Sequence, residues 1–150
     1  MTPLFKKLNL ADNGTILVLN PPESFEAELA ELSGVTVRRR STTKPTSFAI
    51  GFATSQAELT RVATELVSST SGDAIVWIAY PKKTSKRFKC EFNRDSGDWS
   101  VLGNAGFEPV RQVAIDADWS ALRFRRTEYI QALTRQNSMA ISEEGKRRTK

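Results

Sequence analysis

A chain of 150 residues with 39% hydrophobic and 26% charged residues has the size and composition of one globular domain with its own core. Its net charge of +5 is too small for a strongly cationic nucleic-acid binder. The chain has no histidine and a single cysteine, Cys90, which excludes a disulfide within the chain, Ser-His-Asp catalysis and the common zinc sites.

The N-terminal segment MTPLFKKLNLADNG carries lysines with no apolar run after them, so we expect no signal peptide. No apolar stretch approaches the roughly 18 residues that are needed to cross a bilayer. We therefore expect a soluble, cytoplasmic protein without a membrane partner.

The first third of the chain predicts strands that alternate with a helix. Residues 15–20 (TILVLN) are apolar and β-branched, which is typical of a strand. A helix capped by Ser24 is expected next, and Gly34 is expected to end it. Residues 35–39 and 48–52 are the next two predicted strands.

The clearest helix signal begins at Ser55. Ser55 and Glu58 have the spacing of a capping box, in which two side chains satisfy the first free amides of a helix. The apolar stripe that follows has helical spacing and consists of Leu59, Val62, Ala63, Leu66 and Val67. Residues 74–80 (AIVWIAY) are apolar at nearly every position, as in a central parallel strand.

The last part of the domain predicts a weak helix over residues 95–105 and strands over residues 109–115 and 120–125. The four residues between those strands are too few for a crossover, so the strands form an antiparallel hairpin. We assign residues 1–126 to one domain and residues 127–150 to a polar, basic tail that is expected to be disordered.

This alternation predicts an α/β, Rossmann-like domain with three layers and a mostly parallel six-stranded sheet. The order of elements resembles a trimmed class I methyltransferase fold, in which one helix–strand unit is missing where residues 41–47 stand. That resemblance implies the strand order 2-1-3-4-6-5 by chain position, with the sixth strand inserted antiparallel as part of a C-terminal hairpin.

Four motifs carry a closer resemblance: VLN-P at 18–21, WIAYPKK at 77–83, NRD at 93–95 and VRQVAIDADWSALRFR at 110–125. They resemble a family of small bacterial proteins that is catalogued as a domain of unknown function. The resemblance extends over roughly residues 4–126. It implies a fold and no established activity.

A binding site is expected beyond the carboxyl ends of the strands, where open α/β sheets bind their ligands. Residues 82–89 carry five positive charges, which suits phosphate, an anionic metabolite or RNA backbone, although a solvated loop is the alternative. The residues predicted to bind an anion at this rim are Asn20, Arg38, Arg40, Tyr80, Lys82 and Lys83.

The densest polar and aromatic cluster comprises Asp116, Asp118, Trp119, Ser120 and Arg123. Its two carboxylates could position a metal or act as acid and base. We favour a structural hairpin turn, in which Asp116 caps amides, Trp119 packs at the sheet end and an aspartate pairs with Arg123. Cys90 follows several cations that would lower its pKa, but we interpret it as incidental.

Two departures count against a methyltransferase site. The turn after the first strand, Asn20-Pro21-Pro22, has no glycine, and Arg38 lies near the end of the second strand where an acidic residue would hold ribose hydroxyls. We therefore predict no catalytic residues, no metal and no cofactor, with non-enzymatic binding of an anionic metabolite or partner as the function. The alternatives are an S-adenosylmethionine-dependent methyltransferase or a degenerate relative, and an RNA-binding accessory protein.

Overall fold

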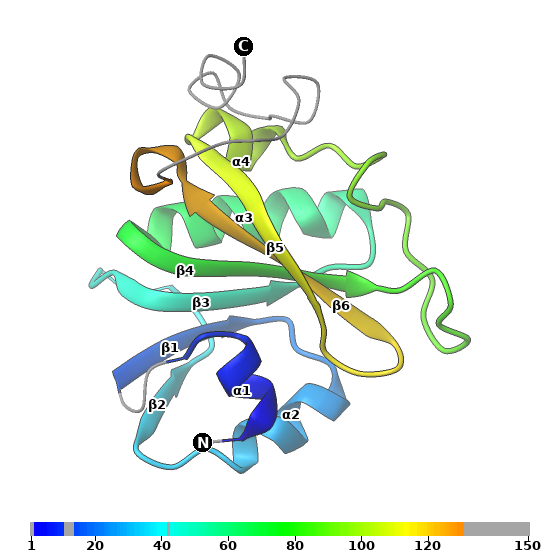
Figure 1. Cartoon of the computed structure of the whole chain (residues 1–150), viewed down its shortest axis with the longest axis horizontal. Coiled ribbons are helices and arrows are strands. Elements are labelled where there is room, and N and C mark those ends of the chain that lie inside the picture. Colours follow the sequence, from blue (N-terminus) through cyan, green and yellow to red (C-terminus); the bar gives the residue numbers. More distant parts are fainter. Residues whose placement is uncertain (1, 11–13, 42, 131–150) are drawn as a thin grey trace.

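The computed structural model describes residues 2–10, 14–41 and 43–130, in which a six-stranded sheet lies between two layers of helices (Figure 1). The helices are α1 (Pro3–Lys7), α2 (Glu23–Ala30), α3 (Gln56–Ser69) and α4 (Ser100–Asn104), with a 3-10 turn η1 (Thr127–Tyr129) after the last strand. The strands are β1 (Gly14–Leu19), β2 (Val35–Arg38), β3 (Thr46–Phe52), β4 (Thr70–Pro81), β5 (Phe107–Ala114) and β6 (Trp119–Arg126).

The strand order is β2-β1-β3-β4-β6-β5, which confirms the predicted α/β class and topology. The first four strands of this order run parallel, and β6 inserts antiparallel between β4 and β5. Val76 of β4 lies opposite Phe124 of β6, and Pro81 lies opposite Trp119. The hairpin turn is therefore held beside the carboxyl end of β4.

The sheet is buried on both faces because its central strands are apolar on both sides. Trp77 and Ala79 of β4 face α1 and α2, whereas Ile78 and Tyr80 face α3 and α4. This double burial explains the uninterrupted apolar run that identified β4 in the sequence.

Helix α1 is a feature that the sequence did not predict, because its five residues are too few for a periodic pattern. It places Phe5 and Leu8 on the sheet, both fully buried. The indole Nε1 of Trp77 donates to the carbonyl oxygen of Leu8 at 3.0 Å. The contact satisfies the buried indole and fixes α1 on β4.

Helix α2 begins differently from the prediction. Its N-cap is Pro22 in an extended conformation, with no side-chain capping bond, and the predicted cap Ser24 lies inside the helix. Two consecutive prolines set this entry because their φ is fixed and they need no donor partner. The helix also ends at Ala30, before the predicted stop at Gly34.

Helix α3 begins as predicted, with Ser55 Oγ accepting from the backbone N of Glu58 at 3.1 Å. Helix α4 is much shorter than the predicted 95–105. The side-chain Oδ1 of Asn93 accepts from the amides of Asp95 and Ser96 at 2.8 and 2.9 Å. Such local side-chain bonds offer the backbone an alternative to the helix, which delays its start to Ser100.

The chain beyond β6 continues to pack on the domain as far as it is described. Thr127 is buried, and its amide donates to the Gly106 carbonyl oxygen at 2.9 Å. The predicted disordered tail falls mostly on residues 131–150, which lie outside the described residues, so the domain boundary at residue 126 stays a prediction. No described helix combines the length and apolar character that crossing a membrane requires.

Candidate ligand-binding site

The carboxyl ends of β1, β3 and β4 meet at one edge of the sheet, and the strand order reverses between β1 and β3. Open α/β sheets bind ligands outside this edge because helices on opposite faces leave a crevice there. The residues that follow these strands therefore define the candidate site.

Asn20 makes the turn that follows β1 in the left-handed conformation, with φ of +57°. Asparagine is one of the few residues besides glycine that tolerates this region. The absence of glycine from the turn was a reason to doubt a methyltransferase site, but Asn20 supplies the conformation for which a glycine would be needed there.

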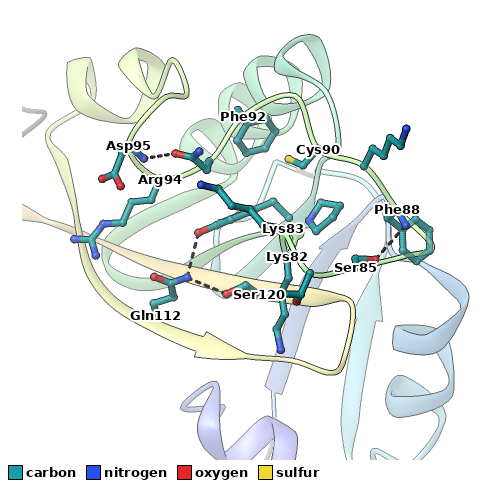
Figure 2. A pocket seen from close by; sticks show the side chains of 15 residues that line it. Lys82, Lys83, Ser85, Phe88, Cys90, Phe92, Arg94, Asp95, Gln112 and Ser120 are labelled. Atoms are coloured by element: carbon teal, nitrogen blue, oxygen red, sulfur yellow. Dashed lines mark hydrogen bonds between the residues drawn. The ribbon is translucent and has the colours of Figure 1, made fainter.

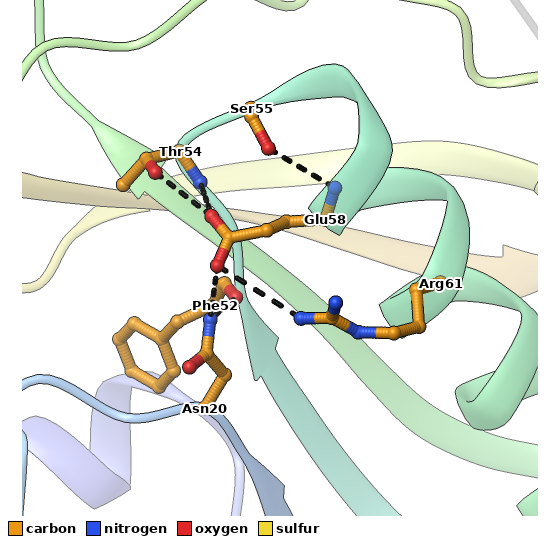
Figure 3. Close-up of polar contacts among 6 residues, drawn as sticks. All are labelled: Asn20, Phe52, Thr54, Ser55, Glu58 and Arg61. Atoms are coloured by element: carbon orange, nitrogen blue, oxygen red, sulfur yellow. Dashed lines mark hydrogen bonds and ion pairs between the residues drawn. The ribbon is translucent and has the colours of Figure 1, made fainter.

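Asn20 also joins the ends of β1 and β3 (Figure 3). Its Nδ2 donates to the carbonyl oxygen of Phe52 at 2.9 Å and to Oε2 of Glu58 at 3.0 Å. The other carboxylate oxygen of Glu58 accepts from the amide and the hydroxyl of Thr54, at 2.9 and 2.8 Å.

These bonds keep Glu58 charged. The backbone bond from Thr54 and the hydroxyl bond from the same residue are the main reasons that the pKa of Glu58 lies below its ordinary value. Arg61 contributes a looser ion pair at 3.9 Å. The point where the strand order reverses therefore carries a carboxylate that is held in its charged form.

A pocket of about 940 Å³ opens one strand away, beyond the carboxyl end of β4 (Figure 2). Gln112 and Ser120 of the closing hairpin lie on one side, and Cys90 and Phe92 on the opposite side, with Lys82 and Lys83 between them. The full lining is Tyr80, Pro81, Lys82, Lys83, Thr84, Ser85, Phe88, Lys89, Cys90, Phe92, Asn93, Arg94, Asp95, Gln112 and Ser120.

A short polar network forms part of the pocket wall on the strands. Gln112 Nε2 donates to the Tyr80 hydroxyl at 3.3 Å and to Ser120 Oγ at 3.1 Å, and Ser120 Oγ donates to the carbonyl oxygen of Val113 at 3.3 Å. Burial raises the pKa of Tyr80, so its hydroxyl is neutral at physiological pH.

The loop that roofs the pocket, residues 82–99, is fastened to the domain at both ends. At the hairpin, Ser85 Oγ donates to Asp118 Oδ1 at 2.8 Å. At the helix, the backbone N of Gln56 donates to Glu91 Oε1 at 3.0 Å, and the Gln56 side chain exchanges two bonds of 2.9 Å with the backbone of Asp98. The pocket is therefore held open by side chains on α3 and the hairpin.

The structure brings some of the predicted anion-binding residues together and separates others. Tyr80, Lys82 and Lys83 line the pocket. Arg38 is the last residue of β2 and Arg40 lies two residues beyond it, and three strand spacings, roughly 14 Å, separate β2 from β4. Asn20 lies between the two groups, beside Glu58.

The hairpin cluster has two features of the predicted structural turn, the Asp116 cap and the packed Trp119, but the predicted pairing of an aspartate with Arg123 is wrong. Asp116 Oδ1 accepts from the amides of Asp118 and Trp119, both at 2.8 Å. The Trp119 ring packs against the ring of Phe52, with centroids 5.3 Å apart. Within the described part of the chain, Arg123 forms no ion pair with either aspartate, and no group of three metal-ligating side chains occurs there.

Sequence reasoning missed Gln112 and Glu58 as site residues. Gln112 lies in the VRQVAID motif, and its place opposite Ser120 depends on the hairpin register. Glu58 was recognised only as a capping residue. Cys90 was placed among cations, yet burial raises the pKa of its thiol, which is opposite to the predicted direction.

No protein-family model matches this sequence, and no curated protein matches it either. The fold is similar to that of solved methyltransferases. A SAM-dependent methyltransferase from Aquifex aeolicus aligns with a TM-score of 0.50 and 13% identity over 83% of this chain and 88% of that protein. DhpI in complex with SAH aligns with a TM-score of 0.53 and 11% identity, over 82% of this chain and 81% of that one.

A third structure, the StiE O-MT, aligns with a TM-score of 0.50 and 7% identity, over 84% of this chain and 74% of that one. The chain therefore has the Rossmann-like fold of class I methyltransferases. This finding contradicts the prediction of non-enzymatic binding as the function, because the structures that share the fold include SAM-dependent methyltransferases. It favours the alternative, a methyltransferase or a degenerate relative.

Proposed function

We propose that this chain is an S-adenosylmethionine-dependent methyltransferase of reduced size. The observation that supports it best is the arrangement at the carboxyl edge of the sheet. A fixed carboxylate lies where the strand order reverses, and a pocket of about 940 Å³ lies beside it. This edge is where the fold class binds its ligands.

The residues at the point where the strand order reverses, here called the switch point, fit the cofactor in backbone conformation and charge. Asn20 makes a left-handed turn after β1, and the ionised Glu58 suits a ligand that carries ammonium and sulfonium groups. Bound S-adenosylmethionine supplies a methyl group on a positively charged sulfur. Asn20 and Glu58 would hold this cofactor, which would supply its methyl group to a lone pair of the acceptor and leave as S-adenosylhomocysteine.

The pocket beyond β4 would hold the acceptor. Its strand residues Tyr80, Gln112 and Ser120 are fixed by hydrogen bonds to one another, and the roof is fastened to α3 and to the hairpin. Groups held on strands keep a bound molecule in one orientation, which is what a transfer between two bound molecules requires.

We further propose that the chain belongs with the small bacterial proteins that share the motif at residues 110–125. The motif forms β5, β6 and the turn between them, and two of its side chains, Gln112 and Ser120, line the pocket. The residues of this motif therefore serve two purposes, since they form the inserted strand of the sheet and one wall of the pocket.

Calorimetry with S-adenosylmethionine and S-adenosylhomocysteine tests the function directly. We expect binding of both, weakened about tenfold or more by Glu58→Gln for S-adenosylmethionine, since that change removes one charge-assisted contact. Glu65→Gln is a matched control, because Glu65 lies on the same helix and accepts from Ser41, away from the edge. If neither compound binds at millimolar concentration, the chain is a degenerate relative that keeps the fold without the cofactor.

A further inference from the structure

The carboxyl edge of the sheet is divided into an acidic half and a basic half. Glu58 lies beside the ends of β1 and β3, and the Glu91 carboxylate accepts from the first amide of α3. Beyond the carboxyl end of β4, the pocket lining holds one carboxylate, Asp95, and four cations: Lys82, Lys83, Lys89 and Arg94.

Within the part of the chain that the structure describes, the four cations of the pocket form no ion pairs. Each of the three ion pairs found there joins other side chains, which lie on α2, on α3, on the strands and, for Arg39, just after β2. The formal charges of the lining therefore sum to a net positive charge. Phe92, which is 4% exposed, gives the pocket an apolar wall beside these charges.

The pocket also offers uncharged polar groups at fixed positions. The Nε2 group of Gln112 is engaged by Tyr80 and Ser120, which leaves its carbonyl oxygen directed elsewhere. The Tyr80 hydroxyl accepts in this network and donates to no described residue. A bound molecule can thus find one acceptor and one donor on the strands, next to the cationic loop.

We infer that this pocket binds the methyl acceptor and that the acceptor is a small molecule with a carboxylate or phosphate group. The inference rests on the proposed function. Lysines of the loop pair with the anionic group, while Gln112 and Tyr80 hold a neutral polar part of the same molecule. The cationic pocket would repel the sulfonium cofactor, so cofactor and acceptor occupy opposite halves of the edge.

Charge reversal within one loop tests the acceptor site. Lys82→Glu/Lys83→Glu alters the pocket lining, whereas Lys86→Glu/Arg87→Glu makes the same change of charge in the same loop outside the lining. Inorganic phosphate and acetate serve as probes in calorimetric titrations of the full chain at low salt. Comparing the two probes distinguishes a phosphate-bearing acceptor from one that carries a carboxylate.

We expect at least one probe to bind the unaltered chain and the Lys86/Arg87 variant with similar affinity. The affinity of the Lys82/Lys83 variant for that probe should be lower by about tenfold or more. Binding of S-adenosylhomocysteine should survive in both variants, and their melting temperatures should match that of the unaltered chain. A Lys82/Lys83 variant that melts earlier is replaced by Lys83→Gln, which must show the same selective loss of the probe.

Equal losses in the two variants would overturn the inference, because they would indicate general attraction to a basic loop. Binding of S-adenosylhomocysteine with no binding of either probe would overturn it as well and leave the proposed function standing. Binding of a probe without S-adenosylhomocysteine would overturn the proposed function, and the assignment of the pocket to a methyl acceptor with it.

Discussion

Asn20 and Glu58 meet at the point where the strand order of the sheet reverses, with the asparagine Nδ2 donating to a glutamate oxygen at 3.0 Å. Because Thr54 holds the other oxygen of the same carboxylate, one side chain connects the exit of β1, the exit of β3 and the first turn of α3. This connection makes Glu58 important for both stability and charge at the candidate site.

Glu58→Gln should lower the free energy of unfolding at pH 7 by about 1–3 kcal/mol. The carboxylate accepts from Asn20 Nδ2 and from the amide and hydroxyl of Thr54, whereas glutamine would turn its NH2 group, itself a donor, toward one of these sides. The pKa of Glu58 is lowered in the folded protein, so its contribution is complete above the ordinary glutamate pKa of about 4.3. The contribution is lost as the pH falls through the lowered folded value. Denaturant unfolding at a series of pH values measures the difference between the two proteins.

The difference between the unaltered chain and Glu58→Gln should therefore shrink in acid. Glu65→Gln serves again as the control, since Glu65 lies on the same helix away from the switch point. A difference that stays constant from neutral to acid pH would show that the carboxylate is not held in its charged form.

The left-handed turn at Asn20 predicts an unusual order of stability among its variants. Asn20→Gly and Asn20→Ala both lose the bonds to Phe52 and Glu58, but only alanine is strained at a φ of +57°. The Asn20→Ala variant should be less stable than the Asn20→Gly variant by about 1–2 kcal/mol, as measured by chemical denaturation. Equal stabilities, or a more stable alanine variant, would contradict the left-handed turn.

The sequence predicted the sheet well because its signals are local. Apolar runs such as that of β4 indicate strands buried on both faces, and the Ser55 cap marks the start of α3. The short connection before Trp119 allowed only a hairpin. Those features, with the resemblance to a known fold, were enough to place β6 between β4 and β5.

The site was much harder to predict because it is assembled by tertiary contacts. The pocket combines the end of β4, a loop that folds back over α3 through Glu91, and Gln112 of an edge strand. No periodic pattern states which way such a loop folds. The conformation of the turn after β1 could not be predicted for a related reason, since the sequence does not show that Asn20 adopts a left-handed conformation.

Gly51 of β3 is a position where only glycine fits. A Cβ atom at Gly51 would lie 2.1 Å from Cγ1 of Val62, because α3 packs closely on the middle of the sheet. Gly51→Ala should cost about 1–3 kcal/mol of stability, the usual cost of overpacking a core. The double variant Gly51→Ala/Val62→Ala removes the clash, so its loss should be smaller than the sum of the two single losses. Strictly additive losses in denaturant titrations would rule out the clash as the cause.

Cys90 provides a chemical probe of the pocket. Its thiol lies in the lining, and burial is the main reason that its pKa lies above the ordinary value, outweighing a bond from the Phe92 amide. Since the thiolate is the reactive form, iodoacetamide should modify the folded protein at pH 7.5 more slowly than it modifies glutathione. As the chain has one cysteine, the increase in mass follows this single site.

The modification rate of Cys90 should rise to that of an ordinary thiol when the protein is unfolded in guanidinium, which controls for the reagent. It should also fall when phosphate or acetate occupies the pocket. Modification of the folded protein faster than glutathione would mean that the nearby cations outweigh burial, as the sequence alone indicated, and that the thiol is activated.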